Sequence, residues 1–448
     1  MGRLLSIVFG VVTLIPLHSL ARSLMGPVAA NRTVWLAAFW PILVLHSVEV
    51  LNMAAYVFFV TVFLDQGWKT LQSEVSEPRG HAVLATLALL AGYWTRPEAM
   101  ALWVFFLCAL IVRGVRRRGR LGSWAVPVEV ILIFLVGISP YVFFLHWQTG
   151  QWTPSRYLTN ITAHTPAQPE RQLPHQVENE TVSSQYLLTR LAEHADEIAV
   201  KYKRNLSRLL SIWFPQVFEP TQVSFAWLCL LVLGWWSFWK QEMLGGWLWL
   251  FGTSLVSISV VALHGGNSRY LLPVIPAILI WLGHSLHLIE KVDKRVMAKL
   301  HGKFPRLPSR TFPLLTITAC LAMAPYACQP VLNPVLGGWP YYPIEYKRAG
   351  YDVRAFWAED NSALIARKPQ VGFYAGLPVR SPSEWTIEGI EKAIPQEITT
   401  DYLVIDERET LALYPELGSF LEGGPPEGWR IVYEDIESPR IRVLARQD

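Results

Sequence analysis

The chain has 448 residues, of which 52% are hydrophobic and only 17% are charged, and it contains 20 tryptophans. This composition is too apolar for a water-soluble enzyme and predicts an α-helical polytopic membrane protein, with no role in binding nucleic acid. The formal net charge of +4 says little by itself, because the placement of basic residues among the loops carries the information.

Ten apolar runs approach the length needed to cross roughly 30 Å of hydrocarbon. They span residues 4–20, 34–48, 50–64, 82–94, 99–112, 126–147, 224–239, 244–264, 270–289 and 312–327. The second and third runs are short, so a broken or re-entrant pair is the alternative to two full spans there. We therefore predict about ten transmembrane helices within residues 1–328.

A short turn between two of these runs carries Arg96 and Glu98 on either side of a proline. Charged residues at a membrane edge usually have a function. A second turn, residues 264–270, carries Arg269 and leads into the next apolar run. Two turns that each offer an arginine predict a site for an anionic lipid head group.

Basic residues gather in two short loops, 113–120 and 290–310. The first holds five arginines and no acid, and the second holds seven basic residues against two acidic ones. Cytoplasmic loops carry such an excess, so both loops are predicted to be cytoplasmic. Alternation then places both arginine turns, the long loop 148–222 and everything after residue 328 on the extracytoplasmic side.

The same alternation places residue 1 outside the cytoplasm, with the first helix running inward. We favour the interpretation that a preceding helix is missing. The alternative is a signal peptide or anchor at residues 1–21, because Arg3 and a long apolar stretch imitate one. That alternative leaves Arg22 and Arg32 on the wrong side of the membrane.

The loop 148–222 begins with a proline-rich segment that contains Arg156. Its later part, 186–213, repeats apolar residues at near-helical spacing and predicts an amphipathic helix along the membrane surface, covering the site.

Residues 329–448 are predicted to form a soluble α/β domain with a partly parallel sheet. Strand-like runs occur at 363–366, 371–374, 402–405, 430–433 and 441–444. This tail has no glycine-rich phosphate loop, metal-ligand cluster or nucleophile elbow, which favours a lid or a docking surface over an independent enzyme.

Three parts of the chain carry recognisable patterns: an apolar helix ending in Thr-Arg-Pro-Glu at 89–98, an Arg-Tyr-Leu-Leu-Pro helix start within 268–276, and the segments 365–376 and 401–406 of the tail. In this order and spacing they resemble the GT-C fold glycosyltransferases that use polyprenyl-phosphate sugars, a group that includes protein O-mannosyltransferases and bacterial aminoarabinose transferases. The resemblance covers most of the chain and implies inverting sugar transfer.

Members of this family begin with a helix and an outward loop, in which a carboxylate serves as base for the acceptor or helps to hold a metal. This chain looks as if it starts after that loop, so we expect it to show little or no transfer as written. Glu49 is the only acid between Met1 and Asp65 and is the candidate catalytic carboxylate. The alternative for Glu49 is a structural carboxylate at the interface.

Transfer from a lipid phosphate needs a base for the acceptor and cations for the departing phosphate. Arg96 and Arg269 suit the second role, because guanidinium binds phosphate oxygens bidentately. The alternative for Arg96 is an ion pair with Glu98 or a position that reaches the interface. The predicted substrate-binding residues are Arg96, Glu98, Arg156, His264, Asn267, Arg269 and Tyr270. No metal-ligand set is predicted, and a divalent metal stays open.

The sequence thus predicts a multi-pass membrane glycosyltransferase, in the bacterial inner membrane rather than the endoplasmic reticulum. It would move a sugar from a polyprenyl-phosphate donor to a lipid, glycan or protein acceptor on the outer face. The alternative is a non-catalytic accessory or transport protein that binds polyprenyl lipids.

Overall fold

The structure of the chain is a computed structural model. The described residues are 2–48, 52–72, 78–116, 124–149, 152, 154, 195–218, 224–240, 244–264, 268–303, 344–358, 362–367, 369–380, 382, 386, 389–390, 401–407, 410, 414–425, 427–435 and 440–446. The chain divides into two compact units. The first comprises residues 1–162 and 182–338, and the second comprises residues 163–181 and 339–448.

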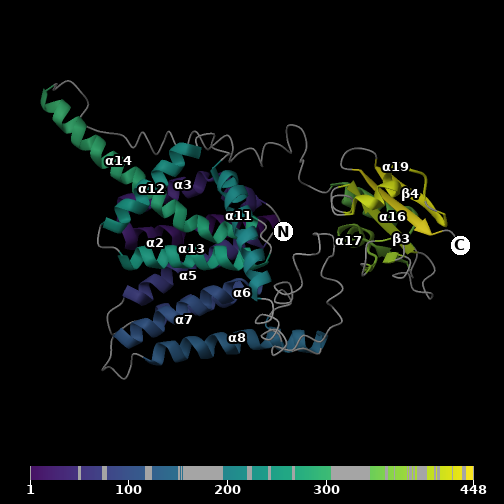
Figure 1. Ribbon diagram of the computed structural model, residues 1–448, viewed down its shortest axis with the longest axis horizontal. Coiled ribbons are helices and arrows are strands. Elements are labelled where there is room, and N and C mark those ends of the chain that lie inside the picture. The colour runs from purple at the N-terminus through teal and green to yellow at the C-terminus, as the bar shows by residue number, and fades with distance from the viewer. Residues whose placement is uncertain are drawn as a thin grey trace. The chain divides into compact units, whose positions relative to one another are not determined.

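The first unit is a bundle of α-helices (Figure 1). Its elements are α1 (Gly2–Val12), α2 (Leu14–Met25), α3 (Pro27–Phe39), α4 (Pro41–Val48), α5 (Met53–Gln72), α6 (Pro78–Thr95), α7 (Ala99–Arg116), α8 (Ala125–Thr149), α11 (Ala195–Phe218), α12 (Ser224–Lys240), α13 (Leu244–His264), the 3-10 helix η5 (Ser268–Val274) and α14 (Ile275–Lys303).

Five stretches of the described helices are long and apolar enough to cross a membrane. They are Leu4–Met25, Ala99–Arg116, Ala125–Trp147, Leu244–Leu263 and Leu271–Val292. A bent pair, α3 with α4, makes a sixth candidate. An integral membrane protein is therefore supported, whereas the predicted count of about ten spans is not reached among the described helices, and the run 312–327 lies outside them.

The buried share of the residues differs strongly between α14 and α8. In the apolar window of α14, 83% of residues are buried inside the protein, against 22% in the window of α8. A helix that is apolar all round and still exposed is typical of a surface that faces lipid. α14 therefore forms the centre of the unit and α8 lies at its lipid-facing edge.

The predicted run 34–48 is broken inside rather than at its end. Trp40 has an extended backbone between α3 and α4, and the axes of the two helices differ by 58°. Pro41 follows at once, and a proline disfavours helical geometry at the residue before it while lacking an N–H group of its own. This break at Trp40 was not predicted. The junction between the runs 34–48 and 50–64, where a broken or re-entrant pair is the alternative, falls at residues 49–51, outside the described residues.

One further boundary differs from the sequence-based expectation. α14 continues to Lys303, so much of the basic segment predicted as a loop from residue 290 onward is helical. The described part of the predicted amphipathic segment 186–213 is helical and belongs to α11. α11 packs against α13, where Asn205 Nδ2 donates a hydrogen bond to the carbonyl oxygen of Ala262 at 2.9 Å.

The second unit contains a five-stranded mixed sheet in the order β2-β1-β3-β5-β4. Its strands are β1 (Ala363–Ile365), β2 (Val379–Arg380), β3 (Asp401–Asp406), β4 (Trp429–Asp435) and β5 (Ile441–Arg446). β1 pairs in parallel with β2 and β3, and β5 pairs antiparallel with β3 and β4. The predicted partly parallel sheet is confirmed.

The predicted strand at 371–374 is wrong, because these residues form the helix α17 (Gln370–Ala375). Pro369 precedes the first turn, and Gly376 ends the helix in the left-handed region at φ +73°. A proline at the start and a glycine just after the end are typical helix boundaries. A run of four apolar residues does not by itself distinguish strand from helix.

Helices cover both faces of this sheet (Figure 1). On one face, α16 (Ile344–Phe356) and α17 pack on alternate strand residues that include Tyr402 and Val404. On the other face, the 3-10 helix η7 (Pro415–Gly418) and α19 (Ser419–Glu422) pack on Leu403 and Ile405. The unit therefore has two apolar layers of its own.

Candidate functional site

The turn between α6 and α7 carries Arg96 and Glu98, as predicted. The Arg96 N–H donates to the carbonyl oxygen of Gly92 at 2.7 Å, and the Ala99 N–H donates to the carbonyl oxygen of Arg96 at 3.2 Å. These bonds close the turn on the last residues of α6. Arg96 is thereby fixed where two antiparallel helices meet.

The Arg96 side chain is held by an ion pair and by sulfur and aromatic neighbours. Its Nη2 lies 2.8 Å from Glu98 Oε1, and its Nε lies 3.2 Å from Glu98 Oε2. Nη1 lies 3.1 Å from the sulfur of Met53, and the guanidinium carbon lies 5.8 Å from the centre of the Tyr56 ring. The Arg96 side chain is only 10% exposed. A charge buried to this degree is stable because the carboxylate and the ring compensate it.

The residue before α5 also contacts the turn that carries Arg96. Asn52 Nδ2 donates to the carbonyl oxygen of Thr95 at 2.7 Å. No local sequence signal predicts the contacts of Asn52, Met53 and Tyr56 with this turn. These contacts arise from helix packing between positions 43 residues apart for Asn52 and Met53. Their spacing at the start of an apolar helix places Met53 and Tyr56 on one side of α5.

The start of the predicted outer loop also reaches this end of the bundle. The Tyr93 hydroxyl donates a hydrogen bond to the carbonyl oxygen of Pro154. Two residues earlier, the ring of Trp152 stacks on His146 of α8 with 4.0 Å between ring centres. Arg156 follows closely in sequence but lies outside the described residues.

Exposed tryptophans mark two levels along α8. Near the C-terminal end of α8, Trp147 is 85% exposed, and Trp94 and Trp152 are exposed at the same end of the bundle. Trp124, just before the N-terminal end of α8, is also exposed. Trp147 follows Trp124 by 23 positions, which corresponds to roughly 35 Å along a helix at 1.5 Å per residue. Tryptophan is enriched at both edges of a bilayer whose apolar core is about 30 Å thick. The Arg96 turn therefore lies at the level of one membrane interface.

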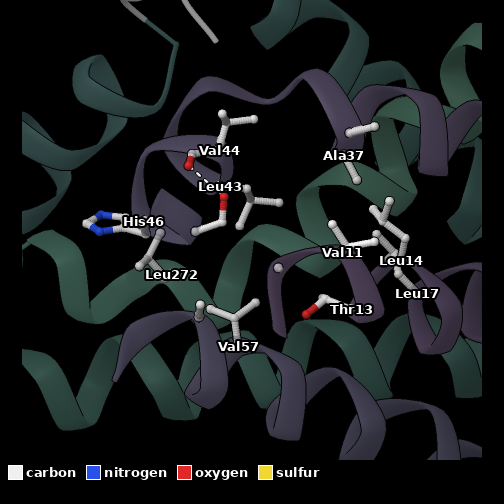
Figure 2. Close-up of a pocket in the computed structure, with 14 residues that line it drawn as sticks. Val11, Thr13, Leu14, Leu17, Ala37, Leu43, Val44, His46, Val57 and Leu272 are labelled. Carbon is white, nitrogen blue, oxygen red and sulfur yellow. Dashed lines mark hydrogen bonds between the residues drawn. The ribbon is translucent and has the colours of Figure 1, made fainter. Parts of the chain in front are cut away.

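An apolar cavity of about 190 Å³ lies between α1, α2, α3, α4, α5 and η5 (Figure 2). Most of its lining is aliphatic, and Thr13, His46 and Ser47 supply polar atoms. Val57 and Leu272 both face it, so α5 and η5 share this cavity. The first turns of α5 thus lie between the cavity and the Arg96 ion pair.

The remaining predicted site residues are described in part or not at all. His264 is the last residue of α13, and Arg269 and Tyr270 lie in the first turn of η5. The positions of these three side chains are not described. Glu49, Arg156 and Asn267 fall outside the described residues. Of the eight predicted residues, the structure brings together Arg96 and Glu98.

Among the described residues, no three His, Cys, Asp or Glu side chains come together as metal ligands. Glu49, the candidate catalytic carboxylate, is not among these residues.

No protein-family model and no curated protein matches the chain. Solved structures do match. ArnT from Cupriavidus metallidurans bound to undecaprenyl phosphate is 14% identical with a TM-score of 0.59, covering 99% of this chain and 83% of that chain. The apo state of the same protein is 12% identical with a TM-score of 0.54 over the same shares. The Archaeoglobus fulgidus oligosaccharyltransferase in complex with Zn and sulfate is 12% identical with a TM-score of 0.53, covering 94% of this chain and 58% of that chain.

At such low sequence identity, these matches show a shared fold but not a shared activity. Both matched proteins are GT-C fold enzymes, and the first of them aligns with almost the whole of this chain. The resemblance drawn from the Thr-Arg-Pro-Glu turn and the Arg-Tyr-Leu-Leu-Pro helix start is thus confirmed for the architecture. The chain has the GT-C fold.

Proposed function

We propose that the chain is a membrane glycosyltransferase that moves a sugar from a polyprenyl-phosphate donor to a lipid, glycan or protein acceptor. We further propose that transfer takes place on the extracytoplasmic face and that residues 329–448 form a domain on that side. The fold supports this, since a matched structure of ArnT holds undecaprenyl phosphate. The alternative is an accessory protein that binds such a lipid without catalysis.

The observation that carries the proposal is the buried Arg96–Glu98 pair at the interfacial end of the helices. A lipid phosphate lies at this level of a bilayer, directly above its apolar chain. A guanidinium already oriented by Glu98 loses little conformational freedom when it binds phosphate oxygens. Arg96 is therefore suited to stabilise the charge that grows on the departing phosphate.

The other roles follow from chemistry and position. Arg269 would contribute a second cation from the start of η5, with His264, Asn267 and Tyr270 beside it in sequence. Glu49 would act as the base for the acceptor or position it. Arg156, just after the segment that Tyr93 holds, would contribute from the loop above the site.

Binding of undecaprenyl phosphate to the full chain in lipid nanodiscs tests the proposal. Arg96→Ala is expected to weaken binding by about 10-fold to 100-fold, because a charge-assisted hydrogen bond contributes on the order of 1.5–3 kcal/mol. Arg116→Ala is the matched control, since Arg116 lies at the other end of α7. Equal effects of the two substitutions would remove Arg96 from the site.

A transfer assay separates the enzyme from the accessory protein. The same nanodiscs are supplied with a panel of polyprenyl-phosphate sugars together with lipid, glycan and peptide acceptors. Both the release of polyprenyl phosphate and the sugar on the acceptor are measured. Release that Arg96→Ala and Arg269→Ala both reduce, at unchanged expression, is the expected result for the enzyme. Because little transfer is expected from the chain as written, a version extended upstream to the next in-frame start is assayed beside it. Tight lipid binding without release from any donor by either version would favour the accessory protein.

A further inference from the structure

An exposed aromatic face lies on the helices α16 and α17 of the second unit. Phe373 is 79% exposed and Tyr351 is 50% exposed. The rings of Tyr351 and Tyr374 lie 5.6 Å apart between centres, and those of Phe373 and Tyr374 lie 5.3 Å apart. Three neighbouring aromatic side chains that leave this much apolar surface in water require an explanation.

Close packing of the two helices assembles this face. A Cβ atom at Gly350 would lie 2.5 Å from the Cβ of Tyr374 and 2.7 Å from the carbonyl oxygen of Val371. The absence of a side chain at Gly350 therefore lets α16 approach α17. This approach brings Tyr351, the next residue of α16, beside Tyr374.

Basic side chains belong to the same face. The Nζ of Lys347 lies 5.7 Å from the centre of the Tyr351 ring. Lys347, Tyr351 and the exposed Arg354 are spaced by four and three residues, which places them along one stripe of α16. We call Lys347, Tyr351, Arg354, Phe373 and Tyr374 the α16–α17 aromatic face.

We propose that the α16–α17 aromatic face inserts into the interfacial layer of the bilayer and docks the second unit on the lipid surface. Aromatic rings beside lysine and arginine are the composition found at bilayer edges. Lys347 and Arg354 complement anionic lipid head groups, each contributing about 1 kcal/mol near such a surface. A neutral glycan offers no such charge complementarity.

The chain itself keeps this face within reach of a bilayer. Its membrane helices belong to the same polypeptide, and α16 begins sixteen residues (328–343) after the predicted span 312–327. Sixteen residues reach at most about 55 Å when fully extended. Such tethering raises the effective concentration of lipid at the face and makes weak insertion sufficient.

Spin-label accessibility in nanodiscs tests the proposal on the full chain. The four cysteines are replaced by alanine, and Ala355→Cys, an exposed position one turn after Tyr351, is labelled. Nanodiscs contain phosphatidylcholine with about one third of anionic phosphatidylglycerol, which supplies the negative surface potential. We expect the label to be more accessible to oxygen than to a water-soluble nickel reagent, whereas a label at Gly424→Cys, next to α19 on the other face of the sheet, shows the reverse.

Matched variants identify the face. The double variant Tyr351→Ser with Phe373→Ser is expected to make the label at Ala355→Cys more accessible to the nickel reagent than to oxygen, as in water. Lys347→Glu is expected to have the same effect in nanodiscs that contain anionic lipid. Phe356→Ser is the control, because Phe356 is 74% exposed but lies about 140° around α16 from Tyr351. An equal loss with Phe356→Ser would overturn the proposal.

Other occupants give different results. An aqueous value at Ala355 in the unaltered face overturns membrane docking. If that label becomes immobile only after oligosaccharide is added, the face binds glycan instead. Spin–spin broadening in nanodiscs that hold two copies would identify it as an interface between chains. None of these outcomes depends on whether the chain transfers sugar.

Discussion

The guanidinium of Arg32 donates two hydrogen bonds to one carboxylate oxygen of Glu290, from Nη2 at 2.7 Å and from Nε at 3.0 Å. The two residues are 258 positions apart and join α3 to the central helix α14. Their side chains are 16% and 9% exposed. The pair thus ties the broken α3–α4 segment to the helix around which the first unit is built.

Removal of one partner is expected to destabilise the first unit. Glu290→Ala or Arg32→Ala leaves a largely buried charge uncompensated, which costs about 3 kcal/mol at such a site. Thermal unfolding in detergent would show this as a lowered midpoint. The joint replacement by leucine at both positions is expected to recover most of the loss, because no charge is then buried. Single variants that unfold at the temperature of the unaltered chain would contradict this role.

Close helix packing at Gly234 gives a second prediction. A Cβ at this position in α12 would overlap the carbonyl oxygen of Trp281 and the hydroxyl oxygen of Ser285, both on α14. Gly234→Ala is therefore expected to cost about 1–3 kcal/mol through forced separation of the helices. Gly80→Ala is the control, since nothing lies within 4 Å of its Cβ position. Loss of stability in both variants alike would refute packing at α12 as the cause.

Some features of the fold could be predicted because the signal is local. The turn at Arg96 and Glu98 lies between apolar runs that cannot continue through two charges and a proline. The strands around Tyr402 and Ile441 were found because β-branched and aromatic residues there are followed by polar residues. In each case a few neighbouring residues determine the structure.

Other features depend on partners distant in sequence. Trp40 ends α3 although its apolar run continues, and a single proline inside a hydrophobic run is also compatible with a kinked helix. Met53 and Tyr56 meet Arg96 because α5 packs against α6, and no motif marks them. The apolar run 371–374 predicts a strand, although Pro369 and Gly376, which bound α17, indicate a helix. Predictions from hydrophobic periodicity alone therefore fail where tertiary packing, or a proline or glycine at a helix boundary, determines the secondary structure.

The orientation of the chain is testable with reporters. Reporters fused after Arg118 or Lys299 are expected in the cytoplasm, because arginine and lysine accumulate in both segments. A reporter at Asp448 is expected on the other side of the membrane. Alkaline phosphatase and green fluorescent protein report opposite compartments and check one another. A cytoplasmic signal from the Asp448 fusion would overturn the arrangement that places residues 329–448 outside.

The last prediction concerns the coupling of Arg96 with Glu98. If Glu98 orients the guanidinium for a lipid phosphate, Glu98→Gln should weaken binding of undecaprenyl phosphate by about 3-fold to 10-fold, within the coupling energies seen for contacting residues. The double variant with Arg96→Ala should bind no more weakly than Arg96→Ala alone, since Glu98 then has nothing to orient. Glu129→Gln on α8 is the control for loss of an acidic group from a membrane helix. If Glu98 instead acts only as a competing anion, Glu98→Gln will tighten binding, and the sign of the change decides between the two roles.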